Sequence, residues 1–153
     1  MKYTIPLQII DLHDDGFHPL VEVVVYGQFF KAVLDTGASK TAFDHTMLLQ
    51  ANAEAAIEST ERLSTGLGTN NMSSGIITLH DLYIGAMPVP NLEVAVLDLS
   101  NINVAYAQMD HPQVLGVIGG DILMKYKAVI DYGKQVLVLK HRKKQHLGHL
   151  PAF

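Results

Sequence analysis

One aspartate in this chain is followed by the small residues that a hydrolytic carboxylate requires. Asp35 begins the run Asp35-Thr36-Gly37-Ala38-Ser39. A carboxylate that activates water must be held rigidly and approached closely by the substrate backbone, and a glycine two residues later permits the tight turn that both conditions need. Thr36 adds a hydroxyl that is expected to hold neighbouring loops together. The tripeptide alone does not establish catalysis, because aspartate and glycine occur together in many ordinary turns.

The residues before Asp35 are expected to form a hairpin that ends at the carboxylate. Leu20 to Tyr26 is rich in valine, which favours a strand, and Phe29 to Leu34 follows as a second apolar strand. Gly27-Gln28 separates the two segments and is typical of a tight turn. Asp35 is therefore expected where a buried strand passes into a loop.

The rest of the chain alternates short strand-like segments with turns. Because the spacing does not suit alternating strand and helix units, it predicts an all-β (mainly β), barrel-like domain with one or two short helices. Residues 1–140 are expected to form this domain, and residues 141–153 a flexible basic tail. Residues 98–113 follow no clear pattern. The expected elements are strands over 4–10, 76–84 and 89–97, helices over 45–55 and 121–126, and a hairpin of 128–132 with 135–139.

Two segments in this order resemble the retropepsin-like aspartic peptidases of the single-domain, bacterial and cellular type. The apolar strand leading into Asp35-Thr36-Gly37-Ala38-Ser39 is similar to the active-site segment of that family. Leu115 to Leu123 is similar to its apolar-apolar-Gly segment and the short helix after it, and the hairpin of 128–139 to its closing hairpin. The resemblance covers most of residues 20–139. It implies a closed six-stranded barrel and a place for Val117, Ile118 and Gly119 beneath the catalytic loop.

The resemblance also implies a mechanism. Asp35 would be the catalytic carboxylate, supported by the loop Thr36, Gly37, Ala38 and Ser39. An aspartic peptidase needs two carboxylates on one water, and this chain has a single Asp-Thr-Gly, so two copies related by a two-fold axis would supply the pair. The glycine-rich run 64–75 corresponds in position to the substrate flap, for which we expect Gly66, Leu67, Gly68, Met72 and Gly75. The acidic residue and the arginine that tie viral dimers together are absent near Ser39 and Gly120.

Other chemistry finds less support in the residues. No Gly-x-Ser-x-Gly elbow surrounds Ser39, so its hydroxyl is expected to bond loop backbone. His146 and His149 have the spacing of helical zinc ligands, but Gly148 and Pro151 disfavour a helix there, and no metal is expected. Gly66-Leu67-Gly68 is not followed by the Lys-Ser/Thr of a phosphate loop. Three other aspartates are expected to cap backbone N–H groups, namely Asp44, Asp121 and Asp131.

Composition narrows the class of protein further. The chain has no cysteine, which excludes thiolate catalysis and agrees with a reducing compartment. Its net charge of −4 does not indicate a surface that binds the phosphates of nucleic acid. No run of the sequence approaches the ~20 apolar residues that are needed to cross a bilayer. We expect a cytoplasmic, homodimeric endopeptidase without a cofactor, which binds protein or peptide substrates and neither nucleic acid nor membranes. A non-catalytic peptide-binding or dimerisation module on the same barrel is the alternative.

Overall fold

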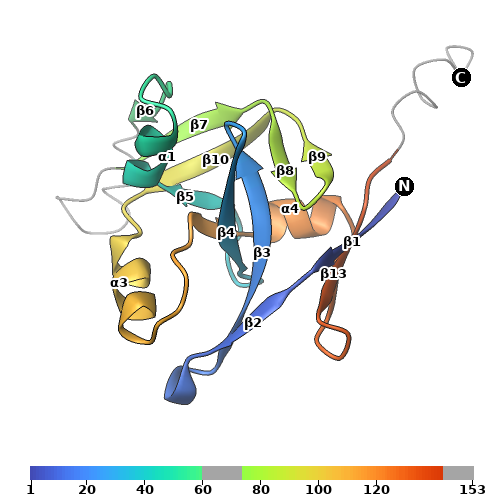
Figure 1. Cartoon of the computed structure of the whole chain (residues 1–153). Helices are drawn as coiled ribbons and strands as arrows, with labels where there is room; N and C mark the ends of the chain where they lie inside the picture. The colour runs from blue at the N-terminus through green and yellow to red at the C-terminus, as the bar shows by residue number, and fades with distance from the viewer. Residues whose placement is uncertain (60–73, 143–153) are drawn as a thin grey trace, which may run out of the picture.

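The hairpin expected before Asp35 forms two inner strands of the larger of two sheets. The computed structural model describes residues 1–59 and 74–142 (Figure 1). Strand β3 (Phe17–Val25) pairs antiparallel with β4 (Gln28–Leu34), from Val25 opposite Gln28 to Leu20 opposite Val33. Tyr26 and Gly27 join the strands with φ angles of 53° and 72°. Two successive left-handed residues are what a tight hairpin turn requires.

The remaining strands extend this sheet on both sides and build a second, smaller one. The order of the larger sheet is β6 (Glu58–Ser59), β7 (Gly75–Leu79), β10 (Leu92–Leu97), β5 (Ala42–Asp44), β11 (Gly116–Ile118), β4, β3, β8 (Leu82–Ile84) and β9 (Met87–Val89), with β2 (Gln8–Asp11) also paired to β3. The smaller sheet has the order β1 (Lys2–Pro6), β13 (Val136–Lys140) and β12 (Val129–Asp131).

Few helices accompany the strands, so the prediction of a mainly β domain is confirmed. The helices are η1 (His13–Asp15), α1 (His45–Ala51), α3 (Ser100–Gln108) and α4 (Gly120–Lys125). Helix α1 stops four residues short of the expected end at Ala55, because Asn52 turns the chain and its side chain accepts the N–H of Glu54. Helix α3 occupies much of the segment that had no clear pattern. None of the helices described here is long and apolar enough to cross a membrane.

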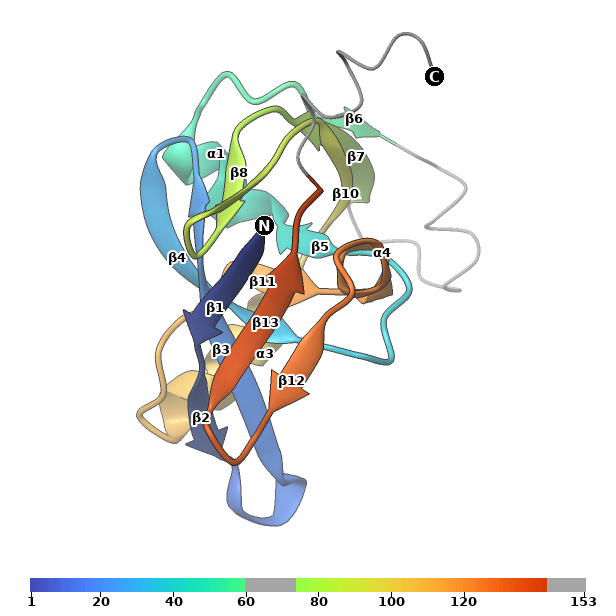
Figure 2. The ribbon, with the colours of Figure 1, turned by 90° about the vertical axis from the view of Figure 1, so that its right-hand side faces the viewer.

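The expected closed barrel is not observed, since neither sheet closes among residues 1–59 and 74–142. The larger sheet runs from β6 to β9, and these edge strands have only two and three residues with which to pair. The expected strand over 4–10 is also divided. Its first half pairs with β13 as far as Pro6, and its second half pairs with β3 from Gln8, so the chain passes between the two sheets at Leu7 (Figure 2).

Two clusters of buried side chains hold these elements together. The larger one joins both sheets with α1 and α4, and its fully buried members include Phe43, Leu48, Ile118 and Leu137. The smaller one lies between β3, β4 and α3, and it is formed by Ile10, Leu12, Leu20, Val33, Tyr106 and Val114. Because Val33 precedes Asp35 by two residues, this second cluster supports the end of β4 that carries the candidate carboxylate.

Candidate active site

Strand β11 lies between the two strands that flank the Asp35 loop. It runs parallel to β4, with Ile118 opposite Leu34, and antiparallel to β5, with Val117 opposite Ala42. The backbone N–H of Asp35 donates to the carbonyl oxygen of Ile118 over 2.9 Å. The loop from Asp35 to Thr41 is thus anchored at both ends to the same short strand, which fixes the direction in which Asp35 leaves the sheet.

Asp35 itself is exposed in a tight turn. One of its carboxylate oxygens, Oδ1, accepts the N–H of Gly37 over 3.0 Å, and its carbonyl oxygen accepts the N–H of Ala38 over 3.1 Å. No lysine, arginine or histidine of the described chain forms an ion pair with it. Its second oxygen, Oδ2, makes no hydrogen bond within the described residues, so the carboxylate is oriented by the turn and remains accessible to solvent.

Gly119 and the residues beside it hold the loop from below. The N–H groups of Gly120 and Asp121 donate to the carbonyl oxygens of Ala38 and Ser39, over 2.7 and 3.1 Å. A Cβ atom at Gly119 would lie 2.8 Å from the carbonyl carbon of Lys40 and 2.9 Å from the carbonyl oxygen of Ala38. Such distances are too short for a side chain, so a glycine is required for this close approach.

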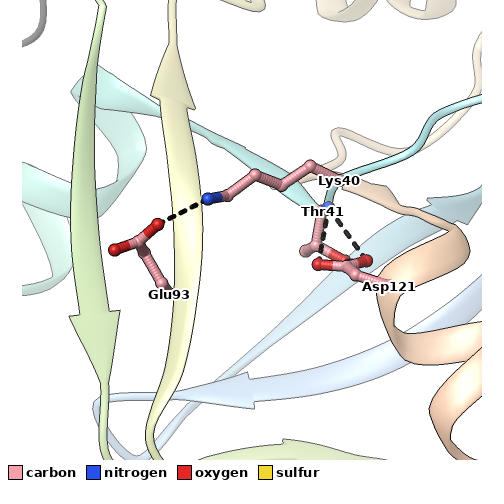
Figure 3. A network of polar contacts seen from close by, with 4 residues as sticks. All are labelled: Lys40, Thr41, Glu93 and Asp121. Carbon is pink, nitrogen blue, oxygen red and sulfur yellow. Dashed lines mark hydrogen bonds and ion pairs between the residues drawn. The ribbon is translucent and has the colours of Figure 1, made fainter.

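A buried threonine completes the support, although no sequence pattern pointed to it. The hydroxyl of Thr41 donates to Oδ1 of Asp121 over 2.8 Å and accepts the N–H of Gly119 over 3.1 Å. The N–H of Thr41 also donates to the carboxylate of Asp121 (Figure 3). Thr36, which was expected to hold loops together, is exposed, and its hydroxyl makes no hydrogen bond within the described chain. Thr41 has that role instead, because it lies at the buried end of the loop.

Beside this network, an ion pair crosses from the loop to strand β10. The Nζ atom of Lys40 lies 2.6 Å from Oε1 of Glu93, and the two side chains are 41% and 53% exposed (Figure 3). Both residues line the cleft that also contains Asp35. The pair therefore places one positive and one negative charge in this cleft.

Two clefts meet at Asp35. The larger, of about 1240 Å³, is lined by loop residues from Asp35 to Lys40 and by apolar side chains of β10 and α3. The smaller, of about 510 Å³, extends to the start of β3 and to β12. Asp35, Ile102 and Val117 line both. The carboxylate of Asp35 is therefore accessible from both clefts.

The expected flap can be followed only at its end. Gly66, Leu67, Gly68 and Met72 lie outside the described residues. Gly75 is the first residue of β7, where it pairs with Ser59 and Val96, and a Cβ atom there would lie 2.5 Å from the carbonyl oxygen of Glu58. Gly75 is therefore a buried sheet residue at the end of the segment expected to form the flap, and its part in a flap stays a prediction.

The aspartates that were expected to cap backbone groups do so. Asp44 accepts the N–H groups of Met47 and Leu99, and Asp131 accepts that of Lys134. Asp121 accepts the N–H of Ile122 in the first turn of α4 in addition to its bonds with Thr41. Within residues 1–59 and 74–142, no histidine, aspartate and glutamate side chains gather into a group that could hold a metal ion. His146 and His149 lie outside these residues.

Comparisons with known proteins agree with this geometry. The family model described as aspartyl protease matches residues 21–122, two thirds of the chain, including the Asp35 loop, β11 and the start of α4. Two solved structures have the same fold. The retroviral protease-like domain of Ddi1 from Leishmania major is 18% identical, with a TM-score of 0.58, and the match covers 80% of this chain and 88% of that one. A retropepsin-like aspartic protease from Rickettsia conorii is 21% identical, with a TM-score of 0.53, and the match covers 91% and 90%.

A search of curated proteins by sequence finds no match. The matched segment nevertheless contains the strand that ends at Asp35, the strand inserted beside it and the glycine beneath the loop. The chain belongs to the aspartyl protease family and has a retropepsin-like fold.

Proposed function

We propose that the protein is a homodimeric aspartic endopeptidase in which Asp35 and its counterpart in a second copy activate one water molecule. The observation that carries the proposal is the state of the Asp35 carboxylate. It is exposed, oriented by the N–H of Gly37, free of a cationic partner in the described chain and located where two clefts meet.

The chemistry needs both copies. One carboxylate accepts a proton from the attacking water, while the other, protonated, donates a hydrogen bond to the scissile carbonyl. Two carboxylates that share one proton titrate as a pair, as the dyads of aspartic proteases are known to do. A two-fold axis beside Asp35 would join the clefts of the two subunits into one continuous groove. Thr36 and Gly37 would then shape the turn that presents each carboxylate.

The test compares wild type with Asp35→Asn in the cleavage of an unfolded protein at mildly acidic pH. Asparagine retains a side-chain oxygen for the N–H of Gly37 but cannot act as a base, so we expect at least a ~10²-fold loss of kcat with an unchanged fold. Asp11→Asn is the matched control, because Asp11 makes the same bond to the N–H of the residue two positions later and is also exposed.

Analytical ultracentrifugation of all three proteins gives the oligomeric state. A dimeric wild type that cleaves, together with a dimeric Asp35→Asn that does not, supports the shared-carboxylate mechanism. Cleavage that survives in Asp35→Asn, or a monomeric wild type that cleaves, contradicts it. A wild type that binds the unfolded protein without cleaving it indicates the peptide-binding module instead.

A further inference from the structure

The smaller cleft contains a histidine whose position is tied to that of Asp35. In the β3–β4 ladder Leu20 lies opposite Val33. The ladder ends there, but His18, two residues before Leu20, and Asp35, two residues after Val33, both line the cleft of about 510 Å³. His18 is half-buried and belongs to neither the Asp35 loop nor its support.

A buried tyrosine holds this histidine. The hydroxyl of Tyr106, on α3, lies 2.6 Å from Nδ1 of His18, and the two ring centroids are 5.9 Å apart. Tyr106 is only 3% exposed, and this burial raises the pKa of its phenol to about 12. The ring of His111, whose Nε2 bonds the carbonyl oxygen of Asp11, packs edge-on against Tyr106 from another side. Tyr106 is thus a fixed, neutral hydrogen-bonding partner.

The hydrogen bonds available to Tyr106 determine which nitrogen of His18 carries a proton. Nδ1 of His18 is the only acceptor that the described residues offer to the buried hydroxyl, and a buried hydroxyl without an acceptor is costly. The hydroxyl therefore donates to Nδ1, and the neutral imidazole carries its proton on Nε2. Nε2 has no partner within the described chain. It is a donor that a ligand in the cleft could use.

The other walls of the cleft favour a particular ligand side chain. Leu34, Val117 and Ile130 offer apolar surface, and Phe17 and Tyr132 add aromatic rings that are 60% and 55% exposed. An aliphatic stem that ends in an oxygen acceptor suits such walls and the Nε2 donor. The negative charge of Asp35 in the same cleft disfavours a carboxylate and favours a neutral amide.

We propose that the smaller cleft is a specificity subsite for a glutamine side chain of the substrate, in which Nε2–H of His18 donates to the amide oxygen and Tyr106 positions His18. This subsite depends on one part of the proposed function, the binding of a peptide in the cleft, and does not depend on cleavage. His18 recognises the substrate and takes no part in the proton transfers of the dyad.

Binding to a catalytically silent Asp35→Asn protein tests the subsite without interference from cleavage. The probes are fluorescent decapeptides of apolar residues in which a single glutamine is moved along the sequence. In a matched series methionine, whose side chain has the same length but no amide, replaces the glutamine. At one position glutamine should bind about fivefold more tightly than methionine, as expected for one neutral hydrogen bond, by fluorescence anisotropy. Adding His18→Leu should abolish this preference, and adding Tyr106→Phe should reduce it. His80→Leu is the matched control, because His80 also bonds a neighbouring side chain through Nδ1 but lines neither cleft.

The absence of a glutamine preference at every position, its survival in His18→Leu, or its equal loss in His80→Leu would overturn the proposal. If His18→Leu does not fold, nitrogen NMR of the His18 imidazole tests the subsite instead. The spectra are recorded for Asp35→Asn and for Asp35→Asn/Tyr106→Phe. The Nε2 resonance of His18 should move when the glutamine peptide binds and should stay unchanged with the methionine peptide. Cleavage of the same peptides by wild type is a separate measurement, so failure of the proposed activity is distinguishable from failure of the subsite.

Discussion

Thr41 and Asp121, 80 residues apart in the sequence, are joined by three hydrogen bonds. The hydroxyl of Thr41 also accepts the N–H of Gly119, so a single side chain connects the end of the Asp35 loop to the start of α4. Thr41 is fully buried. Together with the two backbone bonds from Gly120 and Asp121 to the loop, these part-buried bonds make the geometry of Asp35 depend on Thr41.

Replacing Thr41 by valine should therefore destabilise the protein. Valine has nearly the same shape but leaves the N–H of Gly119 and one bond of Asp121 unsatisfied, at a cost of about 1–3 kcal/mol in the free energy of unfolding. Thr41→Ser retains the hydroxyl and should cost less. Urea denaturation of both variants measures the difference. Equal stability of Thr41→Val and wild type would show that the link is unimportant.

A second prediction concerns the glycine pair before α4. Gly119→Ala would place a Cβ atom 2.8 Å from the backbone of Lys40, whereas at Gly120 the nearest atom, the carbonyl oxygen of Ala38, is 3.4 Å away. Gly119→Ala should lower the free energy of unfolding by about 1–3 kcal/mol and reduce peptide cleavage, because the Asp35 loop must move to admit the methyl group. Gly120→Ala, in the first turn of the same helix, is the control and should be tolerated better. A reversed order of the two stabilities would contradict this account.

The sequence predicted those parts of the fold that depend on neighbouring residues. The β3–β4 hairpin, the cap of α1 by Asp44 and the final hairpin all follow from local preferences, although the first turn lies at Tyr26-Gly27, one residue earlier than predicted. The barrel was predicted wrongly, because closure depends on the pairing of edge strands far apart in the chain. Helix α3 escaped prediction because Tyr106 is its only buried residue, which leaves no apolar stripe to detect.

In the candidate site, too, the features that depend on neighbouring residues were predicted and those that depend on distant residues were not. Asp35 was predicted from its own short run of residues together with the resemblance to the retropepsin-like peptidases, and the place of residues 117–119 beneath it from that resemblance. Thr41 and His18 could not, because each acts through a partner about 80 or more residues away, Asp121 and Tyr106 respectively. Isolated threonines and histidines occur throughout the chain, and only the tertiary structure distinguishes these two from the others.

The ion pair of Lys40 with Glu93 should influence substrate choice more than stability. Both side chains are partly exposed, and such pairs contribute less than about 1 kcal/mol. Lys40→Met would leave Glu93 unpaired at the cleft, so the ratio of kcat/KM for a lysine-containing peptide over its glutamate analogue should rise a few-fold, and high salt should weaken this effect. Lys134→Met, which removes an exposed lysine in the turn before β13, is the control. An unchanged ratio in Lys40→Met would exclude a role for the pair in recognition.

The stability of the protein at alkaline pH should depend on Tyr106. Burial raises the pKa of Tyr106 to about 12, and an unfolded tyrosine titrates near pH 10. Below about pH 10 both states retain the phenol proton, so the contribution of this residue is fully present. Between about pH 10 and 12 the unfolded state loses the proton while the folded state keeps it, so the free energy of unfolding falls as the pH rises.

Tyr106→Phe removes this group and should make the alkaline loss of stability shallower than in wild type. Lysines titrate in the same range in both proteins, so the comparison isolates the tyrosine. Tyr132→Phe is the matched control, because Tyr132 is 55% exposed at the other side of the same cleft and should follow wild type. Urea denaturation at a series of pH values between about 9 and 12 measures all three. If the curves for Tyr106→Phe and wild type are parallel, the hydroxyl of Tyr106 is not shielded from solvent in the folded protein. Tyr106 would then not be the fixed donor on which the orientation of His18 depends.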